Sequence, residues 1–492
     1  MKLTNNKKFI LNIFSTALII YAVALLPSFA VSVYYKETLF SHTVIAVIVL
    51  CLIIGMTAKA RLTYRASTIK PRVHFFTTLF VWCTLILMTS IINFFASPDL
   101  SVADSIFEAT ASWTTTGAEA VVHAELTSGM LLMRATCNWL GGIGIILIVV
   151  GLLPEWNFTG HSLAITEIPG PSFLKTSDTF KRTYRLIIKI YIALTILELI
   201  LLIIAGMAPF TALLTALSSI STSGIQHINH GIVTDLSTPI KVIITTFSIL
   251  GSINFSFYIL IVLKRFRRLR SQTELTFYTA RILLTTLFIT AVLIHFDRAS
   301  NIPADFGNTL MQVVSCISTS GYTVSHCEHW PLICNYAIML QMFIGTCAMS
   351  TGGGIKVGRF AIGCKSIKNS MYKYIHPHVT KDLEYNHTSL SIADVMNANL
   401  YIAMFMMVFM IGALLIGIDT NDIFSAFDFS QAMITNTGKT FGELTAHSYN
   451  ALNGFSGFSE IVMSVLMLAG RLEIYPLAMI FFKSFWVRDR NV

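Results

Sequence analysis

The sequence contains few charged residues for its length. Only 12% of its 492 residues are Asp, Glu, Lys or Arg, whereas 54% are hydrophobic, and a soluble domain carries about 25% charged residues. This shortage of charge excludes an ordinary soluble domain and indicates an integral membrane protein. Lys and Arg outnumber Asp and Glu by 34 to 25. Because the basic residues lie in separate clusters between apolar segments, they argue against nucleic-acid binding.

The sequence also lacks the motifs of an enzyme or a metalloprotein. Its eight cysteines include no CxxC pair, so no zinc or redox site is indicated. Cys327 and Cys334 can pair if their loop faces an oxidising space, although we favour free thiols. The cluster His326-Cys327-Glu328-His329 has metal-binding residue types, but adjacent side chains rarely point at one ion. No catalytic triad is present, and we expect neither an enzyme nor a bound cofactor.

Two glycine-containing stretches resemble nucleotide-binding loops but each lacks a required residue. Gly438-Lys439-Thr440 resembles the end of a P-loop, yet Met433 occupies the position of its first glycine. The run Gly352-Gly353-Gly354 has Val357 where a GxGxxG motif needs its last glycine. Any effect of a nucleotide must therefore act through a partner protein.

Long apolar runs predict the membrane topology. Because about 20 apolar residues cross a bilayer, we expect about ten spans. They lie at 10–34, 40–58, 73–95, 133–153, 186–206, 238–263, 277–297, 333–350, 396–418 and 459–483. The first run is too long for the apolar core of a signal peptide, so we expect it to remain as a span. Four shorter apolar stretches, which reach only half a bilayer at about 1.5 Å per residue, lie at 102–113, 209–220, 306–317 and 422–434.

Each short stretch ends at a hydroxyl-rich tetrapeptide that closes with glycine. Successive glycines are 107, 97 and 117 residues apart, a spacing that indicates internal duplication. Every position before the glycine carries a hydroxyl except Asn436. The four copies are Thr114-Thr115-Thr116-Gly117, Ser221-Thr222-Ser223-Gly224, Ser318-Thr319-Ser320-Gly321 and Thr435-Asn436-Thr437-Gly438.

The repeating unit is therefore a span, a half-helix, a loop and a second span. We expect an all-α membrane protein with an N-terminal pair of spans followed by four such repeats around a central pore. The predicted boundaries are 1–60 for the pair and 61–155, 156–270, 271–375 and 376–492 for the repeats.

Loop charges predict the orientation of the spans. Basic clusters at 59–72, 175–185, 264–270, 365–381 and 483–490 fall on one side, which we take as cytoplasmic. The opposite loops carry the tetrapeptides and few basic residues, chiefly Arg298 and Lys439. We favour an acidic vestibule that concentrates cations over ordinary hydrophilic loops. Its acids are Asp99, Asp104, Glu108, Glu119, Glu125, Asp235, Asp305, Glu328, Asp419, Asp422, Asp428 and Glu443.

The tetrapeptides suit an alkali cation. Each repeat crosses the membrane twice, so all four repeats point the same way and their re-entrant loops can meet at one axis. The half-helices then present their partially negative C-terminal ends to the pore. Backbone carbonyls can replace the water shell of the ion, and glycine can adopt the backbone angles that turn them inward. The sixteen tetrapeptide residues form the predicted selectivity filter.

Three further stretches carry a resemblance to the TrkH family of bacterial potassium-uptake membrane subunits, in the Trk/Ktr/HKT superfamily. They are Trp139-Leu140-Gly141-Gly142-Ile143-Gly144-Ile145, Ser350-Thr351-Gly352-Gly353-Gly354-Ile355-Lys356 and Gly470-Arg471-Leu472-Glu473-Ile474. The resemblance implies K⁺ bound at the filter residues and K⁺ uptake across the cytoplasmic (inner) membrane of a bacterium. It also implies a homodimer, one pore per protomer, and gating by a cytosolic nucleotide-binding subunit of the TrkA type. The sequence departs from the family at Lys439, where proline is common, and at Cys347 and Met349, where residues are usually smaller.

A gate is expected below the filter. The glycine-rich segment, residues 345–355, carries glycines that disfavour a helix and polar residues that suit a wet cavity; a close-packed helix contact is the alternative. Its candidate gate residues are Gly345, Thr346, Ser350, Gly352, Gly353 and Gly354.

Arg471 and Glu198 are charged residues inside predicted spans. We expect Arg471 in the pore, donating to carbonyls of the glycine-rich segment, rather than in an ion pair with another repeat such as one with Glu198. A structural hydrogen bond between spans explains Glu198 at least as well as a role as a proton-coupling acid. A secondary transporter that couples K⁺ or Na⁺ to H⁺ through Glu198 is the alternative function.

Overall fold

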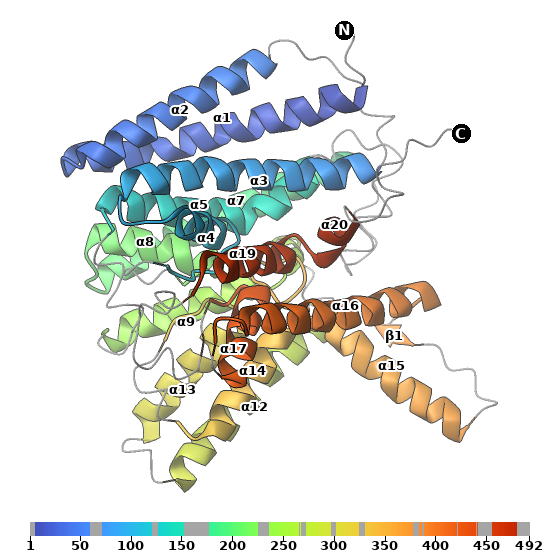
Figure 1. The fold of residues 1–492 in the computed structure, drawn as a ribbon. Helices are drawn as coiled ribbons and strands as arrows, with labels where there is room; N and C mark the ends of the chain where they lie inside the picture. Colours follow the sequence, from blue (N-terminus) through green and yellow to red (C-terminus); the bar gives the residue numbers. More distant parts are fainter. Residues whose placement is uncertain are drawn as a thin grey trace.

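The computed structural model confirms an all-α membrane fold. It describes residues 5–59, 71–120, 126–151, 177–224, 236–264, 266, 272–296, 302–323, 330–376, 383–385, 388–420, 422–438, 440 and 455–479. Within these ranges the strands are β1 (Glu384–Tyr385) and β2 (Thr388–Ser389), which form one short antiparallel hairpin. Long helices run side by side across the molecule, and the shorter helices lie among them (Figure 1).

Two antiparallel helices precede the repeats, as predicted. The first is α1 (Asn5–Tyr34) and the second is α2 (Thr38–Lys59). They pack along one side of α3 and α5 (Figure 1). Glu37 between them accepts hydrogen bonds from the backbone N–H groups of Ser128 (2.8 Å) and Gly129 (3.0 Å). A carboxylate at these first N–H groups of α5 stabilises the helix end and fixes the pair to the first repeat.

Each repeat opens with a long helix and a short one. The long helices are α3 (Pro71–Ala96), α7 (Ser177–Ile204), α12 (Thr273–His295) and α16 (Ile392–Ile416). The short ones are α4 (Val102–Trp113), α8 (Pro209–Ile220), α13 (Ile302–Ile317) and α17 (Ile423–Ile434). Ser101 and Asp422 cap α4 and α17 through their side chains, and Pro209 begins α8. The predicted half-helices are therefore present, and α13 begins four residues earlier than the predicted 306.

The second span of repeat one is α5 (Ser128–Gly151), a single helix. In repeat two, α9 (Thr238–Ser252) and α10 (Phe255–Val262) meet at a bend of 93°. In repeat three, α14 (Leu332–Ile344) and α15 (Val357–Ile375) flank the glycine-rich segment. In repeat four, α19 (Gly457–Arg471) is followed by α20 (Ile474–Met479).

The predicted spans at 238–263, 333–350 and 459–483 are thus wrong as continuous helices. Asn254 explains one break, because its side chain accepts from the N–H of Ser256 and begins a new helix. Left-handed backbone explains the other two, at Gly345 (φ 68°) and Glu473 (φ 66°). Among the described residues, six helices are long and apolar enough to cross a membrane, or seven if α9 and α10 are one span. The predicted total of about ten is larger partly because the broken second spans are too short to qualify.

The outer helices face away from the core. Between 28% and 44% of the residues in the most apolar part of each qualifying helix are buried. The exposed remainder is rich in large apolar side chains, such as Leu284 and Leu287 on α12, as expected for lipid-facing surfaces. The half-helices, in contrast, each bury at least half of their residues, so the chain places the tetrapeptides at its centre.

Candidate functional site: a ring of four loops above a constriction

The four tetrapeptides adopt one backbone conformation. In each, the third residue donates its N–H to the carbonyl five positions earlier, at 2.8–3.0 Å. In each, the second residue and the glycine have positive φ. These angles are 55° and 69° at Thr115 and Gly117, 55° and 55° at Thr222 and Gly224, 58° and 71° at Thr319 and Gly321, and 55° and 67° at Asn436 and Gly438.

This conformation is strained for threonine. A β-branched residue at positive φ is a genuine outlier, and such a residue costs about 1–3 kcal/mol unless its surroundings hold it. Thr115, Thr222 and Thr319 all adopt it at the same place. Strain repeated at equivalent positions marks a functional site rather than an accident of packing.

The first and third side chains of each tetrapeptide hydrogen bond to one another. The hydroxyl oxygens are 2.8 Å apart in Thr114–Thr116, 3.2 Å in Ser221–Ser223, 2.9 Å in Ser318–Ser320 and 2.9 Å in Thr435–Thr437. The first and third hydroxyls therefore brace the loops, and backbone carbonyls are the oxygens that all four loops can offer to a ligand.

The glycines show that the loops close into a ring. Each glycine lies so near the carbonyl oxygen of the third residue of the next loop that a Cβ atom has no room. Such an atom would lie 1.8 Å from Ser223 O at Gly117, 1.4 Å from Ser320 O at Gly224, 2.4 Å from Thr437 O at Gly321 and 2.2 Å from Thr116 O at Gly438. The series runs from loop one to loop four and returns to loop one.

Glycines in the second spans allow these spans to pack closely against the ends of the half-helices. A Cβ on Gly141 would lie 2.0 Å from Trp113 O, one on Gly251 would lie 2.6 Å from Ile220 O, and one on Gly470 would lie 2.1 Å from Ile434 O. These carbonyls belong to the last helical residue before each tetrapeptide. Close backbone approach therefore explains Gly141 and Gly470, which lie in two of the three stretches that carry the family resemblance.

Asn436 departs from the hydroxyl pattern because it reaches two partners. Its Nδ2 donates to Thr116 Oγ1 at 3.0 Å and to Met467 O at 2.9 Å. The side chain thereby joins loop four to loop one and to α19. Its neighbour Lys439 lies outside the described residues, as do Cys327 and the cluster His326-Cys327-Glu328-His329.

The glycine-rich segment is non-helical and lies against the ring. Gly353 fits below loop four, since a Cβ there would lie 2.2 Å from Thr435 O. Its N–H donates to Thr319 Oγ1 at 3.0 Å, and Thr351 Oγ1 lies 3.3 Å from Thr222 Oγ1. The proposed helix–helix contact of small residues is therefore not what these glycines form.

Two cations bind carbonyls of this segment. Arg471, which is 5% exposed at the end of α19, donates to Thr351 O and also to Gly141 O (2.7 Å) and Gly142 O (3.1 Å). Lys356 donates to Gly352 O and to Thr346 Oγ1 (3.1 Å). No carboxylate among the described residues forms an ion pair with Arg471. Glu198 instead accepts from Ser219 Oγ on the adjacent α8.

Sequence reasoning missed the residues that hold the segment in place. Glu274 on α12 accepts from the N–H of Ala348 at 2.6 Å, and Arg281 on α12 donates to Gly345 O at 3.3 Å. Arg359 pairs with Glu473 at 2.8 Å and lies 4.0 Å from the centre of the Tyr401 ring. Charged residues in or beside apolar runs were the available signal, but the partners of Glu274 and Arg281 lie 74 and 64 positions later in the same repeat and those of Arg359 lie in repeat four.

The predicted acidic vestibule is partly wrong. Glu108 and Asp428 are buried on half-helices, with 4% and 0% of their surface exposed. Asp99 and Asp422 are exposed, as predicted. Hydrogen bonds lower the pKa of Asp419, mainly from the side chain of Ser456, and that of Asp422, mainly from the N–H of Ser425. Both therefore remain charged carboxylates on the loop before α17.

These features define a multi-pass membrane protein built from four re-entrant repeats. In each repeat a half-helix turns back at a strained loop, and the four loops form one ring of backbone carbonyls. Comparison with known proteins agrees and is more specific.

The chain belongs to the TrkH family: the model of this family, described as a cation transport protein, matches residues 40–487. The chain is similar to the Trk system potassium uptake protein TrkH of Halomonas elongata, with 27% identity over 97% of this chain and 99% of the relative. It is 28% identical to TrkG of Escherichia coli over 95% and 96% of the two chains. The crystal structure of the potassium transporter TrkH from Vibrio parahaemolyticus superimposes with a TM-score of 0.87 at 25% identity, covering 98% and 99%. The predicted family is confirmed.

Proposed function

We propose that the protein takes up K⁺ across the bacterial inner membrane through a channel-like pore. The ring of four loops, in which each glycine faces a carbonyl of the next loop, is the observation that carries this proposal. The sixteen tetrapeptide residues form the selectivity filter. Relatives named Trk system potassium uptake proteins support the choice of ion.

The chemistry of the ring favours a weakly hydrated monovalent cation. Because the hydroxyls bond to one another, the ion is met by neutral backbone carbonyls that replace its water shell. Mg²⁺ and Ca²⁺ are more often met by carboxylates, and the tetrapeptides contain none. The negative ends of four half-helices stabilise positive charge at the axis.

Arg471 and the glycine-rich segment form the proposed gate. The guanidinium bridges Thr351 O on this segment and two carbonyls of α5, so one cation occupies oxygens that a passing ion would otherwise meet. Thr346, Ser350 and Gly352 belong to the same proposed constriction. Lys356 donates to Thr346 Oγ1 and to Gly352 O, and Ser350 Oγ donates to Thr346 Oγ1. Opening requires these contacts to break.

A cytosolic nucleotide-binding subunit of the TrkA type is the proposed regulator of a homodimer. The helix α15 and the first turns of α16 extend from the body of the molecule with β1 between them (Figure 1). Their ends expose large apolar side chains, including Tyr374 (90%), Ile375 (72%) and Ile392 (88%). Such a surface suits a protein partner, and α15 leads directly back to the glycine-rich segment.

Ion flux into proteoliposomes tests the function. Purified protein should pass K⁺ down its gradient in the absence of a proton gradient. The flux of Na⁺ should be slower than that of K⁺ by a factor of about ten or more. Absence of K⁺ flux under any gradient would overturn the proposal.

A proton-coupled transporter is the second candidate, and Glu198 is its motivating feature. This acid is fully buried, and its Oε2 has no hydrogen-bond partner among the described residues. K⁺ flux that requires a proton gradient and is abolished by Glu198→Gln would favour coupling. Flux that persists without the gradient in both proteins would favour the channel.

A further inference from the structure

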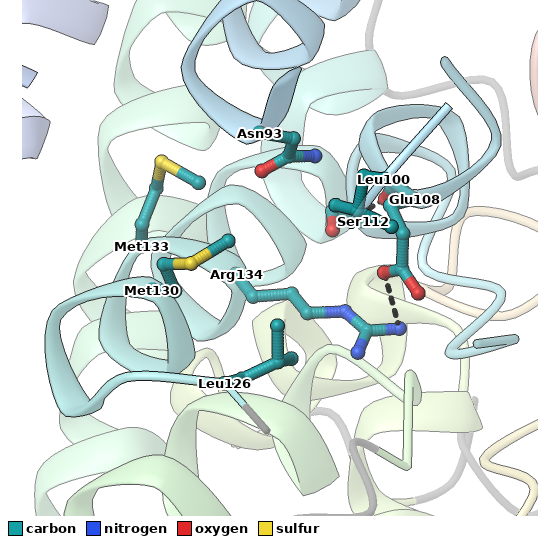
Figure 2. A pocket seen from close by; sticks show the side chains of 8 residues that line it. All are labelled: Asn93, Leu100, Glu108, Ser112, Leu126, Met130, Met133 and Arg134. Carbon is teal, nitrogen blue, oxygen red and sulfur yellow. Dashed lines mark hydrogen bonds and ion pairs between the residues drawn. The ribbon is translucent and has the colours of Figure 1, made fainter. Parts of the chain in front are cut away.

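A buried ion pair lies behind the first loop of the ring. Glu108 on α4 and Arg134 on α5 approach to 3.0 Å between Oε2 and Nη2, and each side chain is only 5% exposed. Figure 2 shows the two side chains meeting across a small cavity lined by residues of α4, α5 and their neighbours. The sequence does not indicate this pair, because it predicts Glu108 among the acids of the outer loops.

Both partners also hold the backbone that leaves the ring. Glu108 Oε1 accepts from the N–H of Ala120 at 2.6 Å, and Arg134 Nη2 donates to Ala118 O at 2.6 Å. The segment directly after Gly117 is therefore fixed at two points by two opposite charges. Hydrogen bonds to charged groups are the stronger kind, so this segment is held firmly.

Ala118 forms part of the seam between loops one and four. A Cβ on Gly438 would lie 2.8 Å from Ala118 N, as well as 2.2 Å from Thr116 O. Asn436 Nδ2 bonds to Thr116 Oγ1 across the same seam. The ring joins its first and last repeats here, so any shift of Ala118 displaces Gly438 and the carbonyl it faces.

The surroundings make the pair sensitive to loss of one member. The cavity beside it has a volume of about 10 Å³, and its lining includes Leu100, Leu126, Met130 and Met133. That volume accommodates about one water molecule. A second carboxylate, Glu119, lies 3.9 Å from Arg134 Nη1, so it compensates the guanidinium only in part when Glu108 is lost.

Repeat three fixes the corresponding carbonyl without charge. Tyr322 follows Gly321 as Ala118 follows Gly117, and Tyr322 O accepts from Ser315 Oγ at 2.7 Å. The residues that follow the other two glycines, Ile225 and Lys439, lie outside the described residues. Repeat three therefore supplies a neutral counterpart within the same ring.

We propose that Glu108 and Arg134 are positioning residues for ion selectivity, which close the seam between loops one and four by fixing Ala118. The inference rests on the proposed K⁺ pore and deepens it. The pair does not touch the ion; it sets the distance between Gly438 and the carbonyl of Thr116, and this distance determines how well the ring replaces the water shell of K⁺.

The test measures the K⁺/Na⁺ permeability ratio of variants from reversal potentials in planar bilayers. Glu108→Gln removes the closer carboxylate and leaves the guanidinium with Glu119 alone, at 3.9 Å. Arg134→Lys keeps the charge but cannot bridge Glu108 and Ala118 O in the same way. Each should lower the ratio by about tenfold, as expected for loss of a hydrogen bond to a charged group. Ser315→Ala, the matched control, should lower it by less than about threefold because it removes a neutral bond.

The double variant Glu108→Gln, Arg134→Met removes both members of the closer pair and leaves Glu119, whose side chain is 12% exposed, as the remaining charge. It should insert as folded protein and still show a lowered ratio, because Ala118 O has lost its donor. Unchanged ratios in folded single variants would overturn the proposal. If the single variants do not fold, an unchanged ratio in the double variant overturns the proposal. Failure of all three variants to fold also overturns it, because the pair would then be required for folding.

The wild type and Gly224→Ser serve as reference proteins. A wild type that does not select K⁺ refutes the proposed function itself. A selective wild type whose selectivity is lost in Gly224→Ser but kept in all variants of the pair refutes only the positioning inference.

Discussion

The ring of four loops and the layer of backbone beneath it differ in their symmetry. All four tetrapeptides share the same positive-φ positions, the same N–H contact to the half-helix and the same pair of bonded hydroxyls or equivalent side chains. The second spans, in contrast, differ in where and how they are interrupted. The span α5 is continuous, α9 and α10 meet at 93°, α14 ends at the glycine-rich segment, and α19 ends at Arg471.

This difference in symmetry matches the different tasks of the two layers in the proposed function. An ion held at an axis needs equal oxygens at equal distances, which repetition of one loop provides. An obstruction needs only one segment that crosses the axis and one contact that holds it. In the proposed function, the glycine-rich segment of repeat three and Arg471 of repeat four have these two roles. Arg471 also binds α5 of repeat one, so the proposal assigns control of passage to the asymmetric layer.

The largest expected effect comes from breaking the ring at Gly224. A Cβ at this position would lie 1.4 Å from Ser320 O, less than at any of the other three glycines, and φ is positive. Gly224→Ser must displace the neighbouring loop. A loss of about 3 kcal/mol of preference for K⁺ would lower the K⁺/Na⁺ permeability ratio by about 100-fold.

Gly206→Ser is the control for Gly224→Ser. Gly206 also has positive φ, at 94°, but nothing lies within 4 Å of its Cβ position. The Gly206→Ser substitution therefore adds backbone strain without contact to the ring, and the permeability ratio of this variant should match that of the wild type. Gly117→Ser and Gly321→Ser should follow Gly224→Ser, with the smaller effect at Gly321. An unchanged ratio in all three would show that the ring does not select the ion.

The second prediction removes the asymmetric layer. Deletion of residues 348–353 eliminates the carbonyls of Thr351 and Gly352, which Arg471 and Lys356 bind. K⁺ flux should rise on the order of tenfold because the obstruction below the filter is gone. Stopped-flow flux on protein that elutes as a single species gives the measurement. A folded deletion variant that conducts at the parent rate would show that the segment is not the gate.

Much of the symmetric layer is predictable from the sequence, and much of the asymmetric layer is not. Four tetrapeptides at near-constant spacing after short apolar runs indicate the loops directly, because their conformation depends on local residues. The run of glycines at 352–354 likewise predicts a non-helical segment. In contrast, the breaks at Ile253 and Leu472 lie in runs whose average hydropathy stays high despite single polar or charged residues at the break, so hydropathy alone hides them.

Long-range pairs set the second limit of prediction. Arg359 and Glu473 are 114 positions apart, and Arg471 contacts residues 120 and 330 positions away. Only the fold brings such groups together. The sequence did predict that Arg471 would donate to the glycine-rich segment, since a charge at that depth requires polar partners. It did not indicate α5 as the second partner.

The third prediction weakens the contact between repeats one, three and four. Arg471→Ala removes the guanidinium donors to Thr351 O, Gly141 O and Gly142 O and removes a positive charge from the proposed pore. Flux of K⁺ should rise severalfold, and control by the cytosolic partner should weaken. Arg471→Lys, which keeps the charge but not the planar fork of donors, should be intermediate. A folded Arg471→Ala protein with lower flux or unaltered regulation would contradict the pore assignment.

The smallest expected effect restores full symmetry to the ring. Asn436→Thr gives loop four the hydroxyl found at the equivalent position of the other three loops. Threonine cannot reach both Thr116 Oγ1 and Met467 O as the amide does, and Thr tolerates positive φ less well than Asn. Loss of one or two neutral hydrogen bonds costs about 1 kcal/mol each, so the permeability ratio should fall by no more than severalfold and thermal stability should decrease. Reversal potentials and unfolding midpoints in K⁺ would measure both. A variant that is more stable and equally selective would show that the asparagine is a tolerated irregularity, whereas the expected losses would show that the seam between loops four and one needs a connection that the other seams lack.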